Sequence, residues 1–81
     1  MLKVYGSLLC PDCVACKAAF EENGLEFEYL DFSMDLLALK AFLKLRDENS
    51  VFIQIKEEGK IGIPCIVTED GTVSLDWERF V

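Results

Sequence analysis

Apolar residues recur with the period of a strand in some segments and with the period of a helix in others. These two kinds of segment alternate along the chain, which predicts an α/β protein. Residues 2–6 form an apolar run that predicts a strand, and Leu25 to Leu30, where apolar and acidic residues alternate, predicts a second. Between them, residues 11–23 predict a helix that begins with a proline and is followed by Gly24. A crossover helix of this kind joins parallel strands, so we expect the first two strands to be parallel.

The middle of the chain predicts two more helices. Ser33 is placed to cap a helix over residues 34–47, and its apolar face is expected to carry Leu36, Leu39, Phe42 and Leu43. Residues 51–58 fit a strand by propensity, but Ser50 before them and Gly59 after them fit a short helix equally well. Of these two alternatives we predict the helix.

A hairpin and a final helical turn complete the predicted order. Ile63 to Thr68 predicts a strand, Asp70 and Gly71 a tight turn, and Thr72 to Asp76 the partner strand. One helical turn follows, from Asp76 to Phe80. The sequence therefore predicts a four-stranded mixed sheet, in the order β-α-β-α-β-β, with helices on its faces and a shortened C-terminal helix.

Composition and charge narrow the functional classes. A chain of 81 residues with 52% apolar residues is expected to form one domain, residues 1–81, with its own core. No run reaches the length of a membrane span, and residues 5–7 interrupt the apolar N-terminus, so no export signal is predicted. The net charge of −7 argues against nucleic acid as a partner. We expect a cytoplasmic protein with no membrane partner.

The strongest chemical signal is the motif Cys10-Pro11-Asp12-Cys13 at the predicted junction of the first strand and helix. Two thiols at this spacing can close and reopen a disulfide. The first turn of a helix presents unpaired N–H groups and a positive dipole end, and both favour the thiolate that attacks disulfides. The motif therefore predicts a thiol–disulfide exchange site.

Pro64 is anomalous inside a predicted strand, because proline donates no hydrogen bond to a sheet. A cis peptide bond between Ile63 and Pro64 at the edge of the strand would explain it.

With these motifs the chain resembles the glutaredoxin-related thiol oxidoreductases of the thioredoxin-like superfamily. The resemblance rests on Tyr5 to Cys13, on Gly62-Ile63-Pro64 and on Asp70-Gly71-Thr72. It implies a thioredoxin-like fold and a catalytic pair in which Cys10 attacks and Cys13 resolves the mixed disulfide. It also implies that Ile63 and the cis Pro64 form a ledge for the bound thiol substrate.

Three departures from the family pattern concern its thiol partner. Family members usually carry a lysine three residues before the first cysteine, a tyrosine inside the motif, and a Gly-Gly pair after the hairpin turn. This chain has Ser7, Asp12 and the segment 72–75 at those positions. The lysine and the Gly-Gly segment serve the carboxylates of glutathione in the family. The sequence therefore leaves open whether glutathione, another thiol or a reductase supplies the electrons.

Pro11 and Asp12 are expected to tune the motif. A carboxylate in the first helical turn stabilises the helix, but beside Cys10 it disfavours the thiolate, and the chain has no histidine to offset it. We therefore expect a redox potential nearer that of thioredoxin, about −270 mV, than the strongly oxidising extreme, about −120 mV. A purely structural role of Asp12 at the start of the helix is the alternative.

Cys16 and Cys65 leave a second class of function open. With Cys10 and Cys13 they could ligate zinc or an iron–sulfur cluster, which would make the protein a metal or cluster carrier. Against this, Cys13, Cys16 and Phe20 share one helical face, which predicts that Cys16 is a buried apolar residue. Cys65 is expected either to pack or to serve as an auxiliary thiol beside Pro64.

The preferred interpretation is an enzyme that reduces disulfides in proteins or low-molecular-weight thiols and takes part in cell redox homeostasis. It requires no cofactor and no metal beyond its redox-active disulfide, which an external thiol or a reductase resets. A non-catalytic adaptor is a third possibility. The wide apolar face of the second long helix, which includes Leu37, Ala41 and Leu45, predicts an exposed patch and a possible homodimer.

Overall fold

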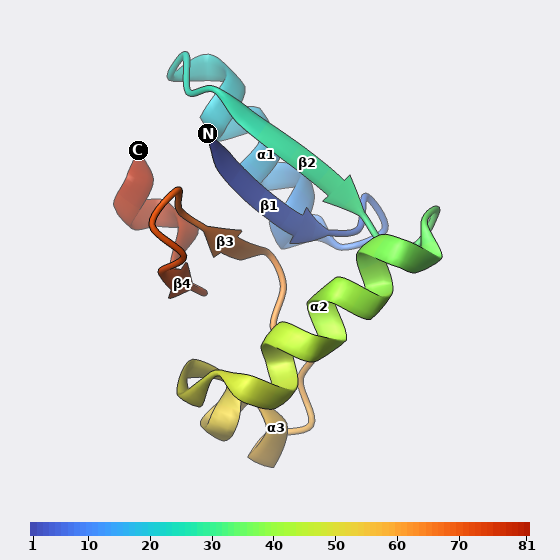
Figure 1. Cartoon of the computed structure of the whole chain (residues 1–81). Helices are drawn as coiled ribbons and strands as arrows, with labels where there is room; N and C mark the ends of the chain where they lie inside the picture. Colours follow the sequence, from blue (N-terminus) through green and yellow to red (C-terminus); the bar gives the residue numbers. More distant parts are fainter.

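The computed structural model describes residues 1–81 and contains four strands, three α-helices and two 3-10 helices. In chain order these are β1 (Leu2–Gly6), α1 (Pro11–Glu22), β2 (Phe27–Asp31), α2 (Leu36–Glu48), η1 (Ser50–Phe52), α3 (Ile53–Glu57), β3 (Cys65–Val67), β4 (Val73–Ser74) and η2 (Trp77–Phe80). Figure 1 shows this order along the chain. No helix has both the length and the apolar character needed to cross a bilayer.

The four strands form one mixed sheet in the order β2-β1-β3-β4. β1 and β2 are parallel, as the crossover helix α1 predicted, with Val4 opposite Tyr29. β3 is antiparallel to both β1 and β4. The predicted fold class is therefore confirmed, including the reduction of the C-terminal helix to the single 3-10 turn η2.

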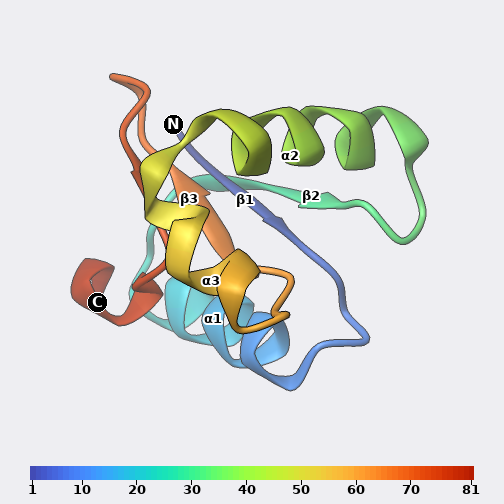
Figure 2. The same cartoon turned by 90° about the horizontal axis from the view of Figure 1, so that it is seen from below.

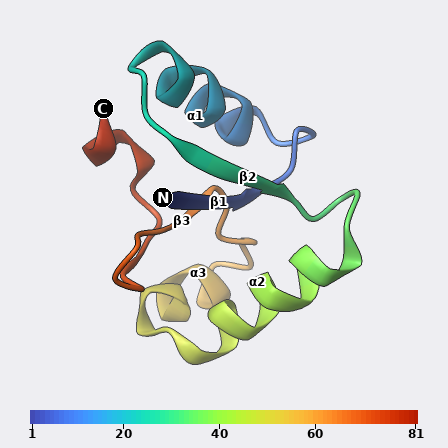
Figure 3. The same cartoon turned by 45° about the horizontal axis from the view of Figure 1, so that its top comes forward.

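Helices cover both faces of the sheet, and Figure 3 shows α1 on one side with α2 and α3 on the other. Because side chains of a strand point alternately to opposite faces, β1, β2 and β3 each supply residues to both cores. The first core joins Val4, Cys16, Phe20 and Ile66 under α1. The second joins Tyr5, Phe42, Phe52 and Cys65 under α2 and α3.

Helix α1 ends in a motif that also fixes the start of β2. Gly24 adopts a φ of +67°, and the N–H of Leu25 donates to the carbonyl of Phe20 at 3.0 Å. In this Schellman motif the N–H of Leu25 is bonded to helix α1 and is not available to a strand, and the Leu25 side chain packs against the core that contains Phe20. The prediction that β2 begins at Leu25 was therefore wrong by two residues, and the strand begins at Phe27.

The predicted cap of α2 was wrong as well. Asp35 is the capping residue, and its Oδ1 accepts from the N–H of Leu37 at 2.9 Å, so the helix starts at Leu36. The packed face is also shifted from the prediction. Ala38 and Phe42 are buried, whereas Leu36 is 79% exposed and Leu43 is 45% exposed.

Ser50–Phe52 and Ile53–Glu57 are helical, so the short helix predicted over residues 51–58 is confirmed and the strand is excluded. Phe52 is fully buried in the second core and meets the ring of Phe42 edge-on, whereas Val51 and Ile53 are exposed. The next side chain that packs in this core is Ile55, three residues on, while Gln54 is exposed, and this spacing is that of a helix. Gly59, with a φ of +70°, ends the segment.

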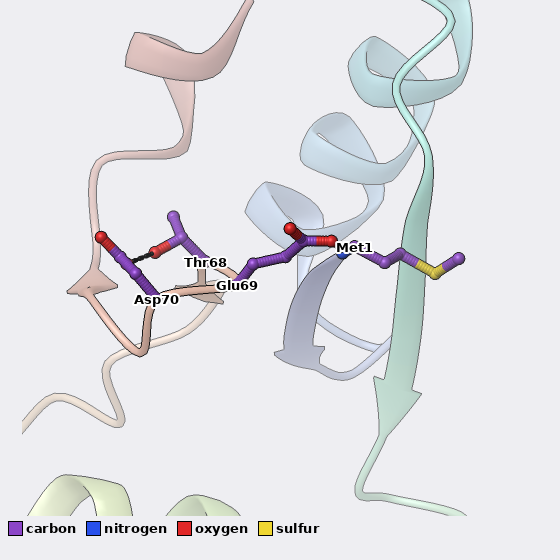
Figure 4. Close-up of polar contacts among 4 residues, drawn as sticks. All are labelled: Met1, Thr68, Glu69 and Asp70. Atoms are coloured by element: carbon purple, nitrogen blue, oxygen red, sulfur yellow. Dashed lines mark hydrogen bonds and ion pairs between the residues drawn. The ribbon is translucent and has the colours of Figure 1, made fainter.

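The C-terminal hairpin is shorter than predicted. β3 spans Cys65–Val67 instead of residues 63–68, and β4 spans Val73–Ser74 instead of residues 72–76. Thr68 lies in the turn instead of the strand, and its Oγ1 donates to the carboxylate of Asp70 (Figure 4). Asp70 also accepts from the N–H of Thr72 at 3.0 Å. The N-terminal amine of Met1 pairs with Glu69 beside this turn.

Candidate active site

Cys10 and Cys13 lie at the start of α1, where the sequence placed them. Cys10 is the N-cap residue and is partly exposed, and Pro11 follows at the first helical position. Cys13 is buried, with none of its surface exposed. The carbonyl of Cys10 accepts from the N–H of Val14 at 3.1 Å, which closes the first turn. Both cysteines are free thiols, and the Cys10 side chain lies close enough to Cys13 to raise the pKa of its thiol.

A tight turn positions the motif. The N–H of Cys10 donates to the carbonyl of Ser7 at 3.0 Å, and the Ser7 hydroxyl accepts from the N–H of Leu9 at 3.1 Å. The same hydroxyl donates to Ser33 Oγ at 3.2 Å, across the gap between the ends of β1 and β2. Ser7 is itself buried, so its side chain points into the fold.

Asp31 joins this network at the end of β2. Its carboxylate accepts from the Ser33 N–H at 2.9 Å and from the Leu8 N–H at 3.4 Å. The hydrogen bonds from Ser33 hold the pKa of Asp31 below its usual value. Sequence reasoning missed the roles of Ser7, Asp31 and Ser33, and it assigned Ser33 to the helix cap instead. The available signal was the Asp-x-Ser spacing directly after a strand predicted to run parallel to the first.

The pKa of the Cys13 thiol is raised to about 12, and burial is the largest cause. The Cys10 side chain also contributes to the rise, whereas the backbone of Ser7 and the hydroxyl of Tyr29 act to lower the pKa. Cys13 therefore rests as a thiol at neutral pH. The two cysteines therefore differ in exposure: Cys10 is partly exposed to solvent, whereas Cys13 is buried.

Gly6 has no side chain, and the sulfur of Cys13 and the hydroxyl of Tyr29 both lie where a side chain at this position would be. A Cβ atom at Gly6 would lie 2.9 Å from Cys13 Sγ and 2.9 Å from Tyr29 Oη, and both distances are too short for a real contact. Glycine is needed here because the sulfur approaches the strand closely, and its φ is not positive.

Gly6→Ala is therefore expected to push Cys13 out of position. Overpacking of this kind costs about 1–3 kcal/mol of unfolding free energy. We expect disulfide reduction to fall about tenfold or more at a temperature where the variant is still folded. Urea unfolding and a disulfide-reduction assay on the same sample measure both effects. Gly71→Ala is the control for a stability loss without a clash at the site: its φ of +89° disfavours alanine, but no atom lies within 4 Å of a Cβ there, so it should lose stability and keep its activity. Wild-type activity in Gly6→Ala would contradict the assignment.

A cleft of about 460 Å³ opens beside Cys10. The segment between α3 and β3 forms its far wall, and Figure 2 shows that segment passing the start of α1. The cleft brings Cys10, Asp12 and Ile63 together. The Ile63–Pro64 peptide bond is cis, and Pro64 is buried next to the cleft without lining it. The remaining lining residues are Ile55, Gly59, Lys60, Ile61, Gly62 and Leu75.

Arg46 holds this wall in place from helix α2. Its guanidinium donates to the carbonyl of Ile61 at 2.9 Å and to the carbonyl of Lys60 at 2.7 Å. Sequence reasoning missed Arg46, and no local pattern marks it, because the contact depends on how α2 and the segment after α3 pack.

The other two cysteines lie on opposite faces of the sheet. Cys16 is buried in the core under α1, as predicted, and burial raises the pKa of its thiol to about 11. Cys65 is buried in the core under α2 and α3, where burial raises its pKa to about 12. No three cysteine or acidic side chains gather into a group that could hold a metal ion. The arrangement gives the carrier hypothesis no ligand cluster, and an auxiliary role for either thiol stays a prediction.

Comparisons with known proteins agree with this geometry. Residues 2–72 match the family model described as Glutaredoxin. An uncharacterized protein of Haemophilus influenzae is 33% identical over 70 residues, which cover 86% of this chain and 81% of that protein. No solved structure matches the chain significantly.

Proposed function

The chain belongs to the glutaredoxin family, and from this membership we propose that it is a dithiol oxidoreductase that reduces disulfides by exchange at Cys10 and Cys13. The observation that carries the proposal is the difference in accessibility between the two sulfurs. Cys10 is partly exposed at a helix start beside a cleft, and Cys13 is buried one turn further along. An attacking thiol must reach the substrate, whereas a resolving thiol only has to reach the first sulfur.

The reaction has two exchange steps. The Cys10 thiolate attacks one sulfur of the substrate disulfide, so that a mixed disulfide forms and the other substrate sulfur leaves as a thiolate and is protonated. Cys13 then loses its proton to solvent and attacks Cys10 Sγ. The second substrate sulfur leaves as a thiol, and the Cys10–Cys13 disulfide remains. Two electrons have passed to the substrate, and two thiols of an external reductant return them.

The lining of the cleft favours a substrate whose disulfide is flanked by apolar residues. Ile55, Ile61 and Leu75 line it, and Asp12 and Lys60 are its charged residues. The family implies that the backbone at Ile63 offers hydrogen bonds to the substrate chain. Ile63 precedes β3, so its backbone groups lie outside the hydrogen-bonded strand. We propose that disulfides flanked by apolar residues bind here.

The cleft offers few groups that could bind glutathione as the reductant. Where the family carries a lysine, this chain has Ser7, whose hydroxyl is engaged by Ser33 and Leu9 inside the fold. Lys60 is then the one cation among the residues that line the cleft, against the two carboxylates of glutathione. We expect glutathione to bind weakly and another thiol or a reductase to reset the pair. The close spacing of Cys10, Cys13 and Cys16 is more often catalytic than structural in a reducing compartment, and on this ground we propose a cytoplasmic protein that acts as one domain over residues 1–81. The possible homodimer stays a prediction.

Equilibration with dithiothreitol tests the function directly. We expect the protein to accept two electrons per chain, and the oxidised form to hold a Cys10–Cys13 disulfide that peptide mass mapping identifies. With Asp12 in the first turn of α1 and no histidine in the chain, we expect a potential nearer about −270 mV than about −120 mV. A disulfide that involves Cys16 or Cys65 instead would contradict the proposed pair. A potential above about −180 mV would contradict the expected effect of Asp12 but not the proposed disulfide pair.

A further inference from the structure

The hydroxyl of Tyr29 is a buried polar atom without a hydrogen-bond partner, and no other buried side-chain nitrogen or oxygen shares this condition. Buried polar groups are nearly always paired, because leaving one unpaired costs its full desolvation. The ring of Tyr29 is fixed in β2, where it packs against the core under α1. Packing therefore holds the hydroxyl where it is, although it gains no hydrogen bond there in the resting protein.

The atom that faces this hydroxyl is the sulfur of Cys13. Both atoms border the space left open by Gly6, since a Cβ there would lie 2.9 Å from each of them. Each also changes the other's protonation: a hydrogen bond from the hydroxyl to the charged sulfur lowers the pKa of Cys13, and burial together with the Cys13 charge raises the pKa of Tyr29. The remaining titratable groups that act on the pair are Cys10 on Cys13, and Asp31 and Cys16 on Tyr29.

We propose that Tyr29 is a positioning residue for the second exchange step, in which its hydroxyl donates a hydrogen bond to Cys13 Sγ as that sulfur becomes a thiolate. The inference rests on the proposed dithiol function and deepens it. A thiol is a weak acceptor and a thiolate is a strong one, so the hydrogen bond forms when the charge develops. The unpaired hydroxyl of the resting state is then the donor held ready for that charge.

The proton balance follows from the same geometry. Cys13 gives its proton to solvent, its thiolate attacks Cys10 Sγ, the bond from Cys10 to the substrate sulfur breaks, and that sulfur leaves and is protonated. Tyr29 keeps its proton throughout, because its own pKa lies above the ordinary value for tyrosine. Its contribution is confined to the step in which Cys13 is charged, and the attack by Cys10 does not involve it.

A chromogenic aromatic disulfide, dithiobis-nitrobenzoate, separates the two steps in a stopped-flow experiment. Attack by Cys10 releases one coloured thiolate, and attack by Cys13 on the mixed disulfide releases a second. Tyr29→Phe keeps the ring and removes the donor. We expect its first phase to be unchanged and its second phase to be about tenfold slower across neutral pH, as loss of a hydrogen bond to a charged group predicts.

Tyr5→Phe is the matched control, because Tyr5 is a buried tyrosine on the neighbouring strand whose side chain packs in the opposite core. Both phases should stay at wild-type rates in this variant. An unchanged second phase in Tyr29→Phe, or equal slowing of both phases, would overturn the role of Tyr29. Failure of the dithiol function is a different result, in which the wild type releases only one coloured thiolate per chain.

Discussion

Replacing Cys10 by serine is expected to abolish disulfide reduction, a loss on the order of a thousandfold or more, because the exposed sulfur is the proposed nucleophile. Cys13→Ser should retain the first exchange step and lose the second. It should therefore accumulate a mixed disulfide at Cys10 when it meets a protein disulfide. Non-reducing gel electrophoresis and intact mass measure the trapped species, and a turnover assay measures the loss.

Cys16→Ala is the matched control for this pair. Cys16 lies on the same helix one turn beyond Cys13 and is buried in the core under α1. Its removal should lower stability slightly and leave both exchange steps intact. Full reductase activity in Cys10→Ser would refute the assignment of the nucleophile. Trapping in Cys10→Ser but not in Cys13→Ser would mean that the two roles are reversed.

The two sulfurs differ because of where the helix begins. Pro11 starts α1 directly after Cys10, so Cys10 remains at the rim while Cys13, three residues on, turns toward the sheet. Gly6 then allows Cys13 to approach β1 closely. The helical spacing predicted that Cys13 faces the sheet, whereas the roles of Cys10 in attack and Cys13 in resolution come from the family resemblance and remain a proposal.

Local signals in the sequence predicted most of the fold. The apolar period, Pro11 and Gly24 placed α1, and the parallel pairing of β1 and β2 followed from the crossover. Errors arose where two local signals competed. Ser33 and Asp35 are both good caps, and the choice went to Asp35 because Ser33 is held by Ser7 and Asp31.

The rest of the site depends on contacts between residues distant in sequence. Arg46 binds the cleft wall across a helix junction, and Tyr29 reaches Cys13 across the gap at Gly6. Neither residue belongs to a motif with Cys10. The alternation in β2 placed Tyr29 on the half-buried face, but only the register with β1 puts its hydroxyl beside the resolving sulfur. Sequence patterns therefore located the two proposed reacting cysteines and missed the side chains that contact them or the cleft wall.

The largest stability loss is expected from Phe52→Ala. Phe52 is fully buried and meets Phe42 with ring centroids 5.9 Å apart at an angle of 80°. Truncating a buried phenylalanine costs about 3–5 kcal/mol. A domain of 81 residues has roughly 4–12 kcal/mol in total, so much of the stability should be lost. Urea unfolding in the presence of a reductant measures it, with the half-exposed Val51→Ala as the control.

The same substitution should also weaken the site, because Phe52 supports the wall of the cleft. A Cβ at Gly62 would lie 2.7 Å from the Phe52 ring, which shows how closely the ring packs under the segment that leads to Ile63. Phe52→Leu keeps much of the volume and should remain folded if Phe52→Ala does not. With Phe52→Leu we expect a smaller stability loss together with slower attack by Cys10 on a protein disulfide. A loss below about 1 kcal/mol in Phe52→Ala would mean that α3 and the cleft wall do not depend on this core.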